Sequence, residues 1–278
     1  MHIGDYDLYH DLLLKRAGLE LRADQSYLLD SRLTPIAKKW RFPSLDAMTM
    51  ALRGMPDAKL VQDIIEAMTD HETYFFMDSP SFRFFRQTAM PHLLKNRRHR
   101  RLRLWCAAAS SGQEAYSLAI ALKEMGPQLA GWTVELMASD VSRQVLALAE
   151  QGVYPQLDVQ RGLAAHDLVR YFDQTRDGQW ALHNEIKKMV SFRYFNLTEP
   201  MMAVGQFDAI FCRNVLSSFG KEMAKQVLSA LVPQLAPDGY LFLGDKEDLP
   251  APIDPLTPVE GVHGLFIHKD NALKKATG

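Results

Sequence analysis

The sequence is poor in cysteine and contains no long apolar run. Only Cys106 and Cys212 occur among 278 residues, each within an apolar stretch, which excludes a disulfide framework and predicts two reduced core residues. No segment approaches the ~20 apolar residues that a membrane helix requires. Asp5, Asp7 and Asp11 interrupt the N-terminus, where a signal peptide would be basic and then apolar. We therefore expect a cytoplasmic protein that does not insert into a membrane.

The chain also lacks an excess of positive charge. Lysine and arginine total 32 against 33 acidic residues, so nucleic acid is not an expected partner. The charge is uneven, however, because the stretch ending at Leu104 holds 17 basic and 13 acidic residues and the remainder holds 15 and 20. This asymmetry favours an acidic partner for the N-terminal part.

Two clusters hold much of the basic surplus. The first, which we call the basic face, lies on an expected helix and comprises Arg32, Lys38, Lys39 and Arg41. The second runs from Lys95 to Arg103 and is interpreted as a solvated linker. For the basic face, a solvated helix surface and a substrate-binding surface remain alternatives.

Residues 1–70 have the pattern of a small helical domain. Apolar side chains recur at three- and four-residue spacing, as at Leu60, Ile64 and Met68, and no run alternates with period two. Proline and glycine separate three or four short helices, with breaks at Gly18, at Pro43 with Ser44, and at Gly54 to Pro56. A linker of residues 71–101 follows and contains the aromatic segment HETYFFMDSPSFRFF.

From residue 102 to 278, apolar strands alternate with amphipathic helices, as in RLRLWC followed by QEAYSLAIALKEMG. Parallel strands need crossover connections, so this alternation predicts an α/β fold with a parallel, doubly wound sheet. The alternation is interrupted at 154–195, where Asp177–Gly178 is typical of a short hairpin. We expect a small antiparallel β-subdomain inserted there.

The turn after the first strand, Ala107 to Glu114, has one glycine, Gly112, and lacks the G-x-G-x-x-G pattern of dinucleotide sites. A nucleoside ligand without phosphates fits it better. Asp140 ends the second strand, where a carboxylate can accept hydrogen bonds from ribose hydroxyls, and Glu114 can face an amino group. Taken singly, Glu114 is equally a helix first-turn charge and Asp140 a helix cap. Together they indicate S-adenosylmethionine.

Several long motifs in register resemble the CheR-type chemotaxis receptor methyltransferases: HETYFF, AAASSGQEAYSLAIAL, ASDVSRQVLALAEQGVY, RYF, FDAIFCRNVL and LAPDGYLFLGDKEDL. The resemblance covers roughly Leu8 to Leu249. It implies an N-terminal helical domain, a linker, a Rossmann-like methyltransferase domain and an inserted β-subdomain. It also implies transfer of a methyl group from S-adenosylmethionine to receptor glutamates, with S-adenosylhomocysteine as product.

The resemblance carries cofactor contacts onto residues of this sequence. They are Thr73, Glu114, Asp140, Asn196, Leu197, Asn214 and Val215. Asn196 can offer its amide to the adenine edge, and Asn214 is expected at the mouth of the pocket beside the methyl donor. Phe75, Phe76 and Phe195 are candidate apolar walls, with core packing as the alternative.

The chain departs from the family pattern at three places. The family motif N-x-T-x-F-F-R has His71 and Met77 at its two ends here, and we count both positions among the candidate cofactor-binding residues. Ser218 occupies the region where the family has an aromatic tyrosine. The arginine absent at Met77 would orient the acceptor carboxylate. We expect Arg83 or Arg86 to replace it, and we group both with Ser218 as candidate catalytic residues.

The expected partners are the cytoplasmic domains of methyl-accepting chemoreceptors, whose acidic coiled coil the basic face would attract. Tight binding of a receptor C-terminal tether peptide is not expected, because the hairpin at Asp177–Gly178 has a single glycine. Two alternatives remain. One is a cofactor-binding regulatory or scaffold protein without transfer activity, suggested by His71, Met77 and Ser218. The other is a methyltransferase for a small molecule or another protein.

Overall fold

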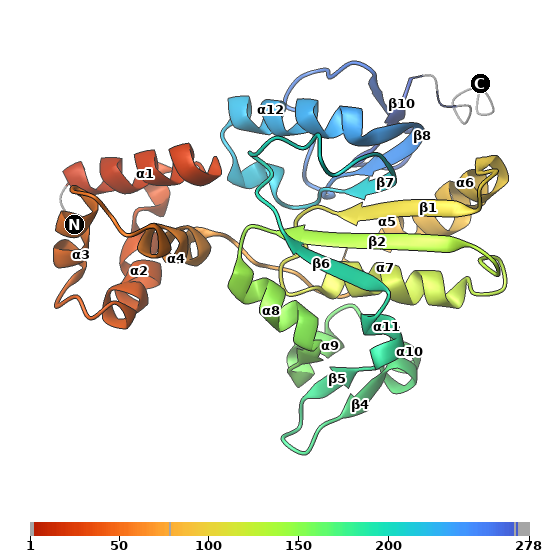
Figure 1. Cartoon of the computed structure of the whole chain (residues 1–278), viewed down its shortest axis with the longest axis horizontal. Helices are drawn as coiled ribbons and strands as arrows, with labels where there is room; N and C mark the ends of the chain where they lie inside the picture. Colours follow the sequence, from red (N-terminus) through yellow and green to blue (C-terminus); the bar gives the residue numbers. More distant parts are fainter. Residues whose placement is uncertain (1–2, 78, 270, 272–278) are drawn as a thin grey trace. The chain divides into compact units, whose positions relative to one another are not determined.

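The computed structural model describes residues 3–77, 79–269 and 271. The chain divides into two compact units (Figure 1). The helical unit comprises the residues up to Asp70 together with Ser217–Ala224. The sheet unit comprises His71–Leu216 together with the residues from Lys225 onward. Within the described residues, no helix combines the length and the apolar character that crossing a membrane requires.

The helical unit follows the breaks in the sequence. Its helices are α1 (Ile3–Ala17), η1 (Ala23–Gln25), α2 (Tyr27–Lys39), α3 (Leu45–Leu52) and α4 (Ala58–Met68). Gly18 ends α1 with a φ of 70°, which glycine adopts without strain. Ser44 caps α3 by accepting a hydrogen bond from the Ala47 N–H, and Asp57 caps α4 through Lys59. Leu29, Leu33 and Ile64 are fully buried between the helices.

A distant segment completes the helical unit. Leu19 forms an isolated antiparallel bridge with Phe219, and the Glu20 N–H donates to the Ser218 carbonyl oxygen at 2.9 Å. This pairing joins residues about 200 positions apart in the chain. No local pattern in the sequence indicates it.

The sheet unit is built on seven strands in the order β6-β2-β1-β7-β8-β10-β9. Their bounds are β1 (Arg101–Cys106), β2 (Thr133–Asp140), β6 (Val190–Tyr194), β7 (Phe207–Phe211), β8 (Leu235–Phe242), β9 (Leu256–Pro258) and β10 (Leu265–His268). The first five are parallel, which confirms the predicted α/β fold, whereas β10 is antiparallel to β8 and to β9. The reversal of strand order falls between β1 and β7, where ligands bind in such sheets.

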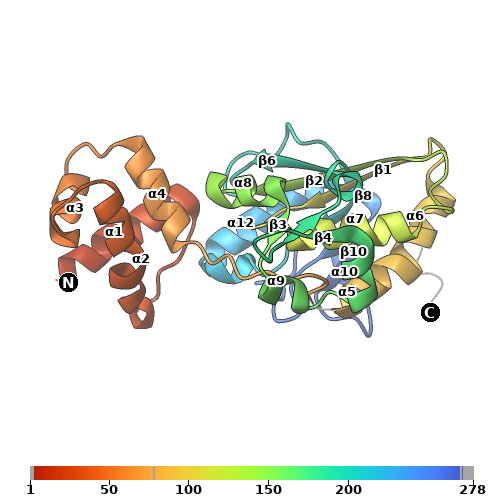
Figure 2. The same ribbon diagram turned by 90° about the horizontal axis from the view of Figure 1, so that it is seen from below.

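The remaining helices of the chain are α5 (Ser79–Phe84), η2 (Phe85–Ala89), α6 (Met90–Asn96), α7 (Gln113–Glu124), α8 (Arg143–Gln151), α9 (Gln156–Gln160), α10 (Ala165–Tyr171), α11 (Asn184–Lys187), η3 (Leu216–Ser218), α12 (Lys221–Leu231) and η4 (Val232–Gln234). Figure 2 shows α5, α7 and α10 together on one side of the strands. Leu104 and Cys106 face the core on that side. Trp105 lies between them in the sequence and packs against Phe207, with 5.2 Å between the two ring centroids.

The expected insertion forms a small antiparallel sheet in the order β3-β5-β4, from strands β3 (Val153–Tyr154), β4 (Phe172–Gln174) and β5 (Trp180–Leu182). The predicted hairpin is present, with a φ of 80° at Gly178 and the Gly178 N–H donating to the Thr175 carbonyl oxygen. Strand β6 falls inside the expected range of 154–195 but pairs with β2 in the large sheet. Half-buried and exposed residues alternate along β6, as in an edge strand. This alternation does not indicate whether the strand belongs to the large sheet or to the small one.

Candidate active site

The turn between β1 and α7 is shaped by close contacts. Gly112 has a φ of 94°, and a Cβ there would lie 3.0 Å from the Ala149 Cβ and 3.2 Å from the Tyr116 ring. Ser110 also has positive φ, at 48°, which turns its backbone N–H toward the end of β2. The turn is therefore built around backbone and small side chains, as a nucleoside site needs.

Asp140 ends β2 as a buried carboxylate with its two oxygens on different donors. Oδ2 accepts the Ser110 N–H and Oδ1 accepts the Ser142 N–H, both at 2.9 Å. Burial raises the pKa of Asp140, against the lowering effect of these backbone hydrogen bonds. A carboxylate held in this way can accept further hydrogen bonds from a pair of hydroxyls, because each oxygen has two lone pairs.

Glu114 lies buried in the first turn of α7, where the helix dipole favours a negative charge. Its Oε1 accepts a hydrogen bond from Arg213 Nη1 at 2.5 Å, and its Oε2 accepts from the Cys106 thiol at 3.1 Å. Burial and the Glu114 carboxylate raise the pKa of Cys106, so the thiol remains protonated and donates. Both carboxylate oxygens of Glu114 are therefore oriented by the protein.

Arg213 joins Glu114 to the aromatic segment. Its side chain is almost fully buried, and its Nη2 donates to the Met77 carbonyl oxygen at 2.9 Å. The neighbouring Asn214 donates from Nδ2 to the Met77 sulfur at 3.3 Å. The sequence analysis did not single out Arg213, although a cation that directly follows the apolar run AIFC is a signal for a buried ion pair.

The aromatic segment is tied down along its length. The Ser110 hydroxyl donates to the His71 carbonyl oxygen at 3.0 Å, and the Phe76 N–H donates to Ser117 Oγ at 2.8 Å. Thr73 lies between these two points and is half-buried. The loop before α10 packs closely against the aromatic segment, because a Cβ at Gly162 would lie only 1.8 Å from the Phe75 carbonyl oxygen.

Asn196 and Leu197 follow the edge strand next to Asp140. The Phe195 N–H donates to the Asp140 carbonyl oxygen at 3.0 Å, which places the FNL turn at the end of β2. Asn196 Oδ1 accepts from the backbone and the hydroxyl of Thr198, which orients the side-chain amide, and Leu197 is buried. Val215 is half-buried beside Asn214.

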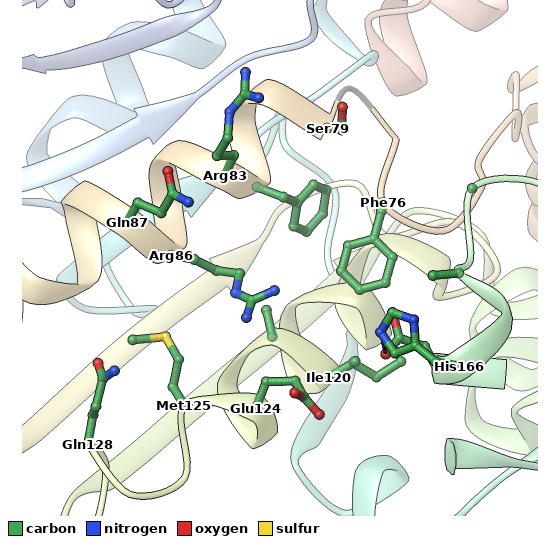
Figure 3. A pocket seen from close by; sticks show the side chains of 15 residues that line it. Phe76, Ser79, Arg83, Arg86, Gln87, Ile120, Glu124, Met125, Gln128 and His166 are labelled. Carbon is green, nitrogen blue, oxygen red and sulfur yellow. Dashed lines mark ion pairs between the residues drawn. The ribbon is translucent and has the colours of Figure 1, made fainter. Parts of the chain in front are cut away.

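The remaining candidates lie elsewhere. Arg83 and Arg86 line a groove whose walls do not include Glu114, Asp140 or Asn214 (Figure 3). Ser218 belongs to the helical unit, where its carbonyl oxygen accepts the Glu20 N–H. The roles of these three side chains in catalysis remain predictions.

The basic face is only partly available to a partner. Arg32 donates to the carbonyl oxygens of Met68 and Thr69 at the end of α4, and Lys39 pairs with Asp63 at 2.8 Å. Lys38 and Arg41 are exposed, and neither forms an ion pair within the described ranges.

Comparison with known proteins decides the family. The model described as "CheR methyltransferase, SAM binding domain" matches residues 71–263. The chain belongs to the CheR methyltransferase family. Chemotaxis protein methyltransferase Cher2 of Pseudomonas putida is 35% identical over 248 residues, which are 88% of this chain and 90% of that protein. Chemotaxis protein methyltransferase 1 of Pseudomonas aeruginosa is 37% identical over 251 residues, with the same coverage of 88% and 90%.

The resemblance seen in the motifs is thus confirmed, and the CheR methyltransferase domain takes S-adenosylmethionine as its cofactor. The residues present fit this group, because two buried carboxylates lie beyond the carboxyl ends of neighbouring parallel strands: Asp140 is the last residue of β2, and Glu114 lies in the first turn of the helix that follows β1. The regulatory alternative without transfer activity is not favoured, since the relatives are named methyltransferases.

Proposed function

We propose that this CheR methyltransferase esterifies glutamate side chains on the cytoplasmic domains of methyl-accepting chemoreceptors. One observation carries the proposal: two buried carboxylates, Glu114 and Asp140, follow adjacent parallel strands, and the Arg213–Asn214 pair at the end of β7 binds Glu114 and Met77. The names of the relatives, chemotaxis protein methyltransferases, support a chemosensory acceptor. A cytoplasmic location accompanies this choice of substrate.

In this proposal each residue contacts a different part of the cofactor. Asp140 accepts hydrogen bonds from the ribose hydroxyls, Glu114 faces the amino group, and the Asn196 amide meets the adenine edge. Asn214 stands at the mouth of the pocket beside the methyl donor. The remaining wall is formed by His71, Thr73, Met77, Leu197 and Val215.

When bound, S-adenosylmethionine supplies a methyl group on a positively charged sulfur, which an acceptor carboxylate oxygen takes in an in-line displacement while the sulfur keeps the bonding electron pair. A free glutamate has a pKa near ~4.3, so the acceptor is already ionised at neutral pH and no side chain must act as general base. The protein contributes by orientation and exclusion of water, effects that lower a barrier by about 7–11 kcal/mol in favourable cases. Fully buried Phe75 and half-buried Phe76 exclude water at the aromatic segment.

The helical unit supplies the first attraction for the acidic acceptor. Of the basic face, exposed Lys38 and Arg41 are the side chains that remain for long-range steering, whose strength falls as ionic strength rises. We propose that the hairpin around Gly178 does not bind the receptor C-terminal tether peptide tightly. Calorimetry with such a peptide tests this point, and micromolar affinity would contradict it.

The proposal is tested with radiolabelled methyl donor and membranes that contain chemoreceptors. Incorporated label is expected to be released as methanol by base, because a carboxyl methyl ester is base-labile. Cofactor binding without label on any receptor would support the regulatory alternative. Turnover without receptors would support another acceptor.

A further inference from the structure

A groove of about 580 Å³ lies in the sheet unit between α5 with η2, the second half of α7, and the segment that leads into α10. Its lining includes the apolar side chains of Phe76, Phe82 and Ile120 together with polar and charged side chains, of which Figure 3 labels Arg83, Arg86 and Glu124 among others. In Figure 3 the Arg86 side chain points into the groove on the side of Glu124, and Arg83 points outward from α5 at the rim. The volume is ample for several side chains of a partner.

The acidic side chains of this groove are already engaged. Glu124 pairs with Arg170 at 2.9 Å and accepts a hydrogen bond from the Tyr171 hydroxyl. Asp167 lies 3.0 Å from the His166 ring, and burial raises the pKa of its carboxyl even with His166 and Arg86 nearby. The Glu124 carboxylate is therefore already paired with a cation of the protein.

Arg83 and Arg86, by contrast, are exposed, and over the described part of the chain neither forms an ion pair. They stand on either side of the start of η2, a π-helical turn of the kind often found at functional sites. Guanidinium groups bind carboxylates through paired, charge-assisted hydrogen bonds. The lining of the groove thus combines apolar side chains with two exposed arginines.

The groove begins next to the candidate active site. Phe76 lines it, and the following residue, Met77, accepts hydrogen bonds from Arg213 and Asn214. Along α7, Ile120 and Glu124 lie six and ten residues beyond Glu114, which is about 9 Å and 15 Å at 1.5 Å per residue. A rigid acceptor whose glutamate reaches the methyl donor can therefore extend over the groove.

We propose that this groove docks an acidic helical stretch of the methyl-accepting protein, about two to three turns from the glutamate that is methylated. The proposal rests on the proposed function and deepens it by naming a second contact surface for the acceptor, within the sheet unit. A helix of six to ten residues covers about 9–15 Å, which matches the reach along α7. Its apolar side chains contact the half-buried Phe76, and its carboxylates meet the exposed Arg83 and Arg86.

The test compares wild type with the double variant Arg83→Gln/Arg86→Gln on a demethylated receptor fragment. The variant is expected to raise the KM for the fragment roughly 5- to 20-fold, with the Kd for S-adenosylhomocysteine within twofold of wild type. The control is Arg176→Gln, at an exposed arginine of the hairpin outside the groove, which should leave both values unchanged.

A second measurement uses the receptor fragment as the partner in a double-mutant cycle. Replacing its acidic residues six to ten positions from the methylation site by glutamine should raise the KM of wild type but not that of the double variant. Equal effects on both enzymes, or an unchanged KM in the double variant, would overturn the docking proposal while leaving the methylation itself established. If wild type methylates no receptor fragment, the proposed function fails and the docking proposal fails with it.

Discussion

Glu247 holds Asn214 in a left-handed backbone conformation. Its Oε2 accepts the Asn214 N–H at 2.6 Å, and Asn214 has a φ of 58°. The same oxygen accepts the Gly244 N–H at 2.9 Å, and a Cβ at Gly244 would lie 2.1 Å from Asn214 Oδ1. The segments that follow β7 and β8 therefore meet at one buried carboxylate, which aims the Asn214 amide at Met77.

Glu247→Ala is expected to lower kcat about tenfold or more and to destabilise the fold by about 1–3 kcal/mol, because two backbone N–H groups lose their acceptor. Glu247→Gln keeps an acceptor oxygen and should recover most of both losses. Steady-state kinetics and denaturant unfolding measure the two effects. An alanine variant with wild-type kcat would show that Asn214 does not depend on Glu247.

Gly162→Ala should disturb the aromatic segment. Alanine in the left-handed region costs about 1–2 kcal/mol by itself, and here the added Cβ would also lie 1.8 Å from the Phe75 carbonyl oxygen. The matched control is Gly178→Ala, which has a similar φ of 80° but nothing within 4 Å of the added Cβ. We expect only the Gly162 variant to weaken S-adenosylhomocysteine binding, and equal affinities in calorimetry would contradict this.

Met77→Arg is expected to raise kcat/KM for the receptor about tenfold. A charged hydrogen bond to the acceptor carboxylate is worth about 1.5–3 kcal/mol, and 1.4 kcal/mol corresponds to tenfold in rate. Met77→Leu is the control of similar size and should stay within threefold of wild type. If the arginine variant is no faster than the leucine variant, the acceptor carboxylate does not lie beside position 77.

The affinity for S-adenosylhomocysteine should fall on acidification, and the fall should begin above the pKa of a free aspartate. The reason is that burial raises the pKa of Asp140, whose ionised form is the better acceptor for hydroxyls. The pH dependence of folding stability has the opposite sign, because the pKa of Asp140 is higher in the folded than in the unfolded protein. Asp140 therefore stabilises the fold below its unfolded pKa near ~3.9, and this contribution is lost as pH rises through its folded pKa. Asp140→Asn should bind weakly at every pH and show no such fall.

The sequence alone was sufficient for the main architecture, because helix breakers and strand–helix alternation are local signals. Gly18 and Ser44 end and begin helices where expected, and the parallel strands follow from the need for crossovers. The pairing of Leu19 with Phe219 could not be predicted, since it joins distant segments with no local pattern. The antiparallel strands β9 and β10 are short and carry a similarly weak signal.

The positions of the two carboxylates could be predicted, because they lie at or just after the ends of strands. The side chains that orient other site residues through hydrogen bonds could not be identified from the sequence. Asp140 ends β2, and Glu114 lies in the first turn of the helix that follows β1, as expected. Glu247 is one of three acidic residues in GDKED, and only the fold distinguishes it. Arg86 lies within the π-helical turn of η2, and no sequence pattern indicates this turn.

Calorimetric titration of wild type and Asp140→Ala with S-adenosylhomocysteine tests the cofactor site most directly. We predict saturable binding of one molecule by wild type and at least a tenfold loss of affinity in the variant, at a temperature where circular dichroism shows both proteins to be folded. Equal affinity in the two proteins, or no binding by wild type, would contradict the account.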